Sequence, residues 1–214
     1  MAIVTKGPYV GFSGTVDGLT YYQLPNGKTV VKRKNGKRTK PAAPGQLPIM
    51  NDTAICAQFM KPLKEFVKIG YDIEAGILQD NPNNAMVKHI RKNAVVGEYP
   101  ERKIDFSKVL VTKGLMPAPE VIATEVTEEG IAIHWDTSLI PKKTFYSDQV
   151  IILAFFAALG ESRYISGGAQ RHLGSDLLIL EGIEKDAEME IYIAFVSDDR
   201  KNISNSVYLG QFSW

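Results

Sequence analysis

The sequence predicts a mostly β protein with a small α-helical segment. Three observations support this prediction: the chain opens with glycine and strand-forming residues, continues with apolar residues at helical spacing, and then changes to alternating apolar and polar residues. We therefore expect an N-terminal β-hairpin arm at 1–40, two or three helices and a connecting strand within 41–117, and an antiparallel β-sandwich at 118–214.

The length and charge of the chain set the first limits. The chain has 214 residues, of which 44% are hydrophobic, and it can bury a substantial core. A total of 25 Lys and Arg against 24 Asp and Glu gives a formal net charge of +1. A protein that coats DNA usually carries a larger basic excess, so any basic segment here acts as a local patch. The single cysteine, Cys56, cannot form an internal disulfide, and its apolar neighbours predict a buried side chain.

Two tight turns are predicted in the arm. Asn-Gly pairs at 26–27 and 35–36 stand where two-residue hairpin turns belong. Around them we expect the strands TYYQLP, KTVVKRK and KRTK, which form two successive hairpins. In the middle strand each face mixes valine with a basic residue, as Val30 and Lys32 show. An edge ribbon fits this pattern better than a core strand.

The second half of the arm is strongly basic, and we call it the basic ribbon. Its members are Lys28, Lys32, Arg33, Lys34, Lys37, Arg38 and Lys40. Such a ribbon could contact several phosphates of a nucleic acid, and the binding would then weaken steeply with salt. It could equally face an acidic protein partner, because charged edges also keep sheets from pairing at random. A plain solvated ribbon is the third interpretation.

The arm also contains apolar strand residues that a partner could cover. The candidate assembly residues are Tyr21, Tyr22, Val30 and Val31. An isolated hairpin is marginal in water, so we expect the arm to pack on another sheet, either in this chain or in a neighbour. Base stacking by the two tyrosines is less favoured, because adjacent strand residues point to opposite faces.

A helical pattern begins after the PAAPG stretch at 41–45. Apolar residues then recur at steps of three and four, at Ile55, Phe59, Leu63, Phe66 and Val67. This spacing lays one apolar stripe along a helix or a pair of helices, and Pro62 is expected to bend or restart it. A further helix is predicted at 81–95, with Asn81 as its cap and Pro82 in its first turn.

From about residue 104 the apolar residues alternate, as in half-buried strands. The predicted strands are 108–112, 120–126, 131–135, 148–156, 176–180, 190–196 and 206–210. Short strands at regular spacing, separated by turn-rich segments and by no helix, favour an antiparallel sandwich of the immunoglobulin-like type. We place its start after the Pro-Ala-Pro linker at 117–119.

Two features of the C-terminal region carry a resemblance to a known fold. Trp135 in IHWD stands where fibronectin type III domains keep an aromatic core residue on the second strand. The run LEGIEKDAEMEIYIAFV at 180–196 is similar to the approach to their sixth strand. The region thus resembles a fibronectin type III sandwich. It departs from the pattern near Met189, where the corner tyrosine would fall, and near Lys185, where a proline is usual.

Four stretches carry a second resemblance: GFSGTVDGLTYY, PGQLPIMNDTAICAQFMKPLKEFVKIGY, NAVVGEYPERKIDFSKVLVTKG and SNSVYLG. Through them the chain resembles an uncharacterised bacterial family of unknown function over nearly its full length. Where that family often shows an arginine in the first helix, this chain has Asn51 or Asp52 nearby. The resemblance implies no activity.

No catalytic or metal-binding motif stands out. His89, His134 and His172 fall in a helix, a strand and a loop, without a partner at metal-ligand spacing. The sequence contains no nucleophile elbow, phosphate-binding loop or dinucleotide fingerprint. We therefore predict no catalytic residue, no metal and no cofactor.

The expected location follows from the apolar runs. Glycines and a proline interrupt the N-terminal segment, which lacks the apolar core of a signal peptide, and the longest apolar run, 150–160, is too short to cross a bilayer. We expect the chain to be synthesised in the cytoplasm and not to insert into a membrane. The final compartment stays open, because incorporation into a virion and non-classical export both fit.

The functional hypothesis is a non-catalytic structural or interaction protein. We expect a homo-oligomer, or a complex with a protein partner, joined through the arm in a virion-like particle or an extracellular fibre. Sandwich domains without a pocket chemistry most often serve as scaffold or adhesion units. The alternative is a nucleic-acid-binding accessory protein that uses the basic ribbon at 28–40. An enzyme would need a site between domains that no local motif reveals.

Overall fold

The computed structural model describes residues 2–24, 27–36, 41–138 and 144–214. Its internal contacts divide the chain into two compact units, Met1–Ala43 and Pro44–Trp214. The predicted limit of the arm at residue 40 lies close to this division. The predicted boundary between 41–117 and 118–214 falls inside the second unit.

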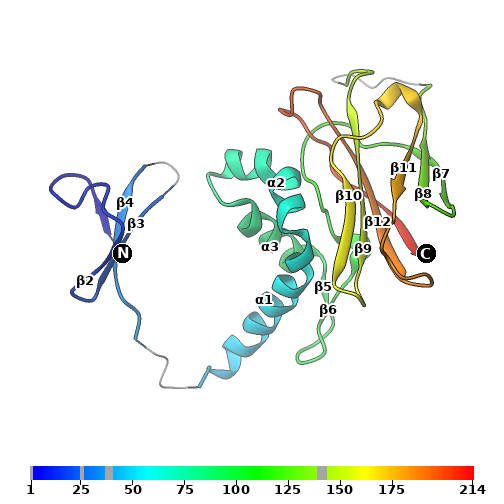
Figure 1. Ribbon diagram of the computed structural model, residues 1–214. Helices are drawn as coiled ribbons and strands as arrows, with labels where there is room; N and C mark the ends of the chain where they lie inside the picture. Colours follow the sequence, from blue (N-terminus) through cyan, green and yellow to red (C-terminus); the bar gives the residue numbers. More distant parts are fainter. Residues whose placement is uncertain (1, 25–26, 37–40, 139–143) are drawn as a thin grey trace. The chain divides into compact units, whose positions relative to one another are not determined.

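The first unit is an antiparallel sheet of four strands in the order β1-β4-β3-β2 (Figure 1). The strands are β1 (Ala2–Val4), β2 (Gly14–Val16), β3 (Leu19–Gln23) and β4 (Thr29–Arg33). The predicted hairpin of β3 and β4 is confirmed, and β1 and β2 are additions that the sequence reasoning did not foresee. Strand β2 turns into β3 through Asp17 and Gly18, whose φ angles of 47° and 73° suit a tight hairpin turn.

Strand β4 is internal to this sheet. Val4 of β1 pairs with Thr29 on one side of β4, and Gln23 of β3 pairs with Thr29 on the other. The prediction that KTVVKRK forms an edge ribbon is therefore wrong, because the start of the chain returns to pair with it. The further strand predicted at KRTK falls on 37–40, outside the described residues.

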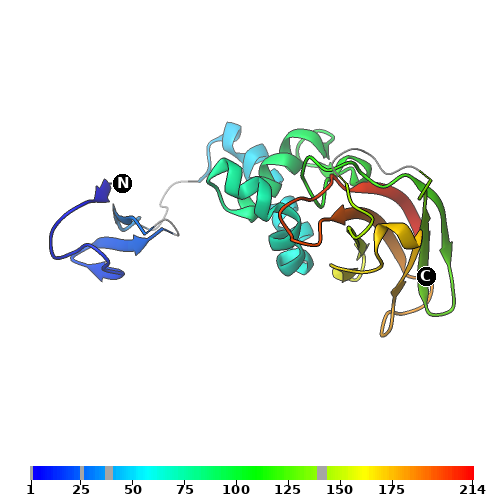
Figure 2. The same ribbon diagram turned by 90° about the horizontal axis from the view of Figure 1, so that it is seen from above.

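The second unit has three layers (Figures 1 and 2). Helices lie on one side, a four-stranded sheet in the order β10-β9-β12-β13 lies in the middle, and a three-stranded sheet in the order β11-β8-β7 lies on the other side. The strands are β7 (Val121–Val126), β8 (Gly130–Trp135), β9 (Gln149–Phe156), β10 (Glu161–Ile165), β11 (Ser175–Ile179), β12 (Glu188–Val196) and β13 (Val207–Ser213). All their ladders are antiparallel, and the predicted sandwich is confirmed.

The helical segment follows the predicted course. Its elements are α1 (Leu47–Met60), the 3-10 turn η2 (Lys61–Leu63), α2 (Lys64–Leu78) and α3 (Pro82–Asn93). Pro62 stands in the 3-10 turn, where it ends one helix before the next begins. The Asn81 side chain accepts a hydrogen bond from the backbone N–H of Asn83 at 2.9 Å, so it caps α3 as expected.

Two apolar clusters lie on the two faces of the four-stranded sheet. From β12, Tyr192 and Ala194 belong to the cluster shared with the helices, whereas Ile193 and Phe195 belong to the cluster shared with the three-stranded sheet. Strands β9 and β12 are therefore buried on both faces. This explains why their sequences are almost continuously apolar instead of alternating.

Trp135 lies in the sandwich core, as expected. Its ring centroid is 5.5 Å from that of Phe195, and its indole N–H donates to the Arg171 carbonyl at 2.7 Å. The tryptophan thus joins the two sheets and also satisfies its polar atom.

The predicted strand at 108–112 is wrong. The 3-10 turn η3 (Phe106–Lys108) precedes this segment, which joins no β ladder. Instead the Val111 N–H donates to Ser206 Oγ at 2.9 Å, and Tyr71 Oη donates to the Leu110 carbonyl at 2.8 Å. The alternation of apolar residues here reflects burial between elements. Strand β10 and the hairpin of β5 (Val95–Val96) and β6 (Lys103–Ile104) were not predicted.

Candidate functional site

The basic ribbon is only partly covered by the structure. Lys28, Lys32, Arg33 and Lys34 are exposed. Lys37, Arg38 and Lys40 lie outside the described residues. Lys32 and Arg33 are neighbours in β4, so they point to opposite faces of the sheet, and Lys28 precedes the other end of the strand. The described ribbon residues therefore do not gather on one face.

The candidate assembly residues lie at the centre of the first sheet. Val30 is buried, whereas Tyr21, Tyr22 and Val31 are partly buried. Tyr21 and Tyr22 occupy adjacent positions of β3 and point to opposite faces, as expected. The ammonium group of Lys32 lies 5.7 Å from the centre of the Tyr22 ring.

An aromatic cluster, which we define as Tyr9, Phe12 and Tyr21, covers part of one face of this sheet. The Tyr21 ring centroid lies 5.5 Å from those of both Tyr9 and Phe12. The loop that carries the first two rings is fixed by Gly11, whose N–H donates to Thr29 Oγ1 at 2.8 Å and whose carbonyl accepts from the Gln23 amide. Sequence reasoning missed Tyr9 and Phe12, because the glycine-rich loop shows no periodic pattern.

Six large apolar side chains of the first unit are exposed to water. The exposed set is Ile3, Tyr9, Val10, Phe12, Val16 and Leu19, with exposed fractions between 36% and 54%. Among its described residues only Thr29 and Val30 are buried. A water-exposed apolar surface of this kind is typical of a sheet that meets a partner.

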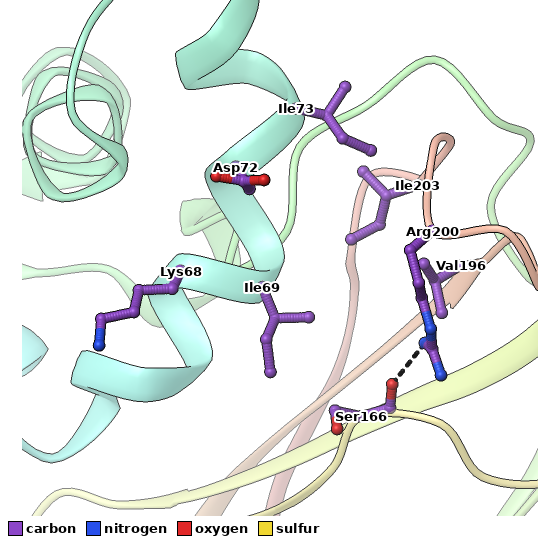
Figure 3. A pocket seen from close by; sticks show the side chains of 8 residues that line it. All are labelled: Lys68, Ile69, Asp72, Ile73, Ser166, Val196, Arg200 and Ile203. Carbon is purple, nitrogen blue, oxygen red and sulfur yellow. Dashed lines mark hydrogen bonds between the residues drawn. The ribbon is translucent and has the colours of Figure 1, made fainter. Parts of the chain in front are cut away.

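A cleft of about 540 Å³ lies between α2 and loops of the sandwich (Figure 3). Ile69 and Ile73 point from α2 toward Val196 and Ile203, which form the opposite wall. The Arg200 guanidinium donates to the Ser166 carbonyl at 2.7 Å across the mouth of the cleft.

The polar groups of this cleft do not form a catalytic arrangement. Ser166 contributes its carbonyl, which already accepts from Arg200, and Lys68 is paired with Glu65 at 2.9 Å. Asp72 is the remaining charged side chain among the described residues that line the cleft. A nucleophile with an adjacent base, as nucleophilic catalysis requires, is missing from this described set.

A buried ion pair supports the loops at one end of the sandwich. Arg171 Nε lies 3.4 Å from an Asp148 carboxylate oxygen, and both side chains are almost completely buried. The same carboxylate accepts from the Phe145 N–H at 2.9 Å, and the guanidinium carbon lies 3.8 Å from the centre of the Phe195 ring. This pair fixes loop geometry, and burial lowers the pKa of Arg171.

The remaining reactive side chains are separated in space. Cys56 is buried among helix residues, and this burial raises the pKa of its thiol to about 11, which keeps it protonated. His89 lies on α3, His134 on β8 and His172 in a 3-10 turn. Within the described ranges, no group of three or more His, Cys, Asp or Glu side chains could hold a metal ion.

Comparison with known proteins gives one match. A family of unknown function (DUF6266) matches residues 11–210. No curated protein and no solved structure matches the chain. The predicted resemblance to a family of unknown function is thus confirmed. Among the helices that the structure describes, none has the length and apolar character needed to cross a membrane.

Proposed function

We propose, for a chain that belongs to the DUF6266 family of unknown function, a non-catalytic structural role in which copies join through the first unit. The observation that supports this proposal is the contrast within that unit. It forms a complete antiparallel sheet, yet six of its large apolar side chains lie in water. Burial of these side chains against a second copy would provide the driving force for assembly.

The open edges of the sheet supply a second argument. Strands β1 and β2 each pair with a neighbour on one side, so their outer edges carry unpaired N–H and C=O groups in the part of the chain that is described. An added strand from another copy would satisfy these groups by β-augmentation. Ile3 and Val16 lie on these two edges and are about half exposed, at 54% and 46%.

In this proposal the second unit is the rigid body of the subunit. Its three-stranded sheet and four-stranded sheet have a strand order that supports a fibronectin type III-like sandwich. The helices occupy the outer face of its four-stranded sheet. A subunit of a virion-like particle or an extracellular fibre would combine such a block with a joining sheet.

The proposal is tested by the mass in solution across a dilution series, measured by light scattering. We expect the full chain to assemble with concentration, and residues 44–214 to stay monomeric. Both apolar clusters of the second unit contain only residues of that unit, so the fragment keeps its core. A full chain that remains monomeric at all concentrations would refute self-assembly.

Point variants test whether assembly depends on the edge strands β1 and β2 or on another part of the surface. Ile3→Lys and Val16→Lys place a charge on β1 and β2 without touching a buried group, and each should weaken assembly at least tenfold. Ile77→Lys is the matched control, because Ile77 is an exposed isoleucine on α2, with 67% of its surface accessible. If the control weakens assembly as much as the edge variants, the joining surface is not the first unit.

The alternative function is nucleic-acid binding by the basic ribbon, and it can be tested separately from self-assembly. Its described members are exposed but point to both faces of the sheet. Retention on DNA that falls steeply with salt, and that disappears in a Lys32→Gln, Arg33→Gln and Lys34→Gln triple variant, would favour the alternative.

A further inference from the structure

A second cleft, of about 410 Å³, opens where three elements of the second unit meet. Helix α1 contributes Ile55 and Phe59, the β5–β6 hairpin contributes Lys103 and Ile104, and the turn between β9 and β10 contributes Ala157. The volume falls in the range of small-molecule sites. The self-assembly proposed above does not involve this cleft.

Three phenylalanine rings form an apolar wall of the cleft. Phe59 lies 4.8 Å from Phe155 and 5.9 Å from Phe106, and the last two rings lie 5.7 Å apart, all measured between ring centroids. Phe59 and Phe155 are buried, whereas Phe106 is partly exposed. An apolar group that entered the cleft would therefore meet aromatic surface that is already packed and fixed.

The opposite wall is held in place by polar contacts between the hairpin and α1. Arg102 Nη1 donates to both carboxylate oxygens of Asp52 at 2.8 Å, and the Asn51 amide donates to the Pro100 carbonyl at 3.0 Å. Asp52 is only 6% exposed, so its carboxylate is shielded from water, whereas the Arg102 side chain is partly exposed. The cleft is thus preformed, and a ligand would not need to order it.

The charges at the cleft point to an anionic ligand group. Arg102 and Asp52 neutralise each other, and the Arg102 Nε is buried without a hydrogen-bond partner. Lys103 is exposed and forms no ion pair with any described residue. The described lining residues include no carboxylate that would oppose an anion. One uncompensated positive charge therefore stands beside an apolar cavity.

We propose that this cleft binds a small amphipathic monocarboxylate. The apolar body of the ligand packs against Phe106 and between Ile55 and Ile104, and its carboxylate lies at the ammonium group of Lys103. One negative charge matches the single uncompensated cation, and the size of the cleft limits the apolar body to a short chain or a single ring system.

The test is a titration of the full chain with octanoate and with octanol, followed by amide shifts in proton–nitrogen NMR spectra. The two probes share an apolar chain and differ in charge. We expect saturable shifts around the cleft, with octanoate bound up to about fivefold more tightly than octanol, because an ion pair with an exposed lysine is worth up to about 1 kcal/mol. Equal affinity of the two probes would refute the role of Lys103, and absence of saturable binding would refute the site.

Variants of the lining residues sharpen the test. Lys103→Gln should lower octanoate affinity up to about fivefold and leave octanol affinity unchanged. Ala157→Trp fills the cleft from an exposed turn position and should remove binding of both probes. Ile55→Gln serves as a second cleft variant and should weaken both probes, in case the tryptophan disturbs folding. Lys92→Gln, an exposed lysine on α3 that does not line the cleft, is the control and should bind as the parent does. Binding that survives both cleft variants would place the ligand elsewhere.

Discussion

The molecule contains two antiparallel sheets of four strands with opposite surroundings. In the sheet β10-β9-β12-β13, every residue of β12 from Met189 to Val196 is buried. In the sheet β1-β4-β3-β2, only Thr29 and Val30 are buried among the described residues. The two sheets have the same number of strands, so strand count does not set their stability. Packing of both faces stabilises the sheet β10-β9-β12-β13, whereas the sheet β1-β4-β3-β2 depends on its ladder and the aromatic cluster.

This difference predicts two levels of stability in one chain. The residues that hold the second unit together should determine its global unfolding, and the first unit should open at lower free energy. Both tryptophans of the chain, Trp135 and Trp214, belong to the second unit. Tryptophan fluorescence therefore reports that unit alone and allows the two sheets to be compared.

The largest expected effect comes from Phe155→Ala in β9. Phe155 is 4% exposed and packs against Phe59 of α1, so its truncation leaves a cavity between helix and sheet and should lower the free energy of unfolding by about 3–5 kcal/mol. Val30→Ala in the first sheet should change the unfolding of the second unit by less than about 0.5 kcal/mol. Denaturant titration with fluorescence detection measures both. A comparable loss for Val30→Ala would show that the two sheets unfold together.

A smaller effect is expected at two glycines of α2. A Cβ on Gly70 would lie 2.3 Å from the Val111 carbonyl oxygen, so Gly70→Ala forces α2 away from the 108–112 segment and should cost about 1–3 kcal/mol. Gly76 faces open space on the same helix, and Gly76→Ala should add about 1 kcal/mol through helix propensity. Thermal unfolding followed by circular dichroism shows whether each variant is less or more stable than the parent. Equal effects of the two variants on stability would contradict the close approach of Gly70 to the Val111 carbonyl.

A still smaller effect is expected in how the free energy of unfolding of the second unit depends on pH. Burial lowers the pKa of His89, so the unfolded chain binds a proton near pH 6.5 while the folded chain does not. The free energy of unfolding should therefore fall as the pH drops from about 7 to 5, and His89→Gln should flatten this slope.

The pH range from about 5 to 7 lies above the usual pKa of Asp and Glu side chains, so a slope in this range distinguishes His89 from the carboxyl groups. Hydrogen bonds from Lys88 and Asn84 lower the pKa of Asp80 to about 2, well below the window. His172→Gln, at an exposed ring far along the chain from α3, is the matched control for the loss of a histidine. A slope that is unchanged in His89→Gln would assign the dependence to another group. Denaturant titrations across the window provide the measurement.

The smallest expected effect lies in the first sheet. Lys32→Gln removes the ammonium group that lies 5.7 Å from the Tyr22 ring centre, and an exposed cation–π contact is worth about 0.5–1 kcal/mol. Hydrogen exchange of the β3 and β4 amides should increase by a factor of up to about five, while exchange in β9 and β12 stays unchanged. Altered exchange in β12 would indicate coupling between the units.

The predictable parts of the fold are those in which local chemistry and tertiary packing agree. The spacing of apolar residues correctly predicted the helix stripe with Phe59 and Phe66 and most sandwich strands, and the residue types Asn81 and Pro82 correctly predicted the helix cap. The turn at Asp17 and Gly18 was missed, although this pair is a strong hairpin signal and would have revealed β2.

Other features depend on neighbours that no local pattern specifies. The alternation at 108–112 predicted a strand, but the backbone there is satisfied by Ser206 and not by a ladder. The strands that became β9 and β12 were predicted as alternating and half-buried, but both of their faces are buried, because the helices cover the second face. The candidate cleft was also hidden, because Phe59, Phe106 and Phe155 come together only through that packing.

The 3-10 turn at Pro62 has a consequence for the dimensions of the second unit. A straight helix over residues 47–78 would be about 48 Å long. Strand β9, with its 8 residues, spans about 27 Å. An unbroken rod would overhang the sheet by nearly half its length and leave its apolar stripe in water. Because the helix is interrupted at Pro62, Phe59 at the end of α1 and Phe66 at the start of α2 both join the apolar cluster on the sheet.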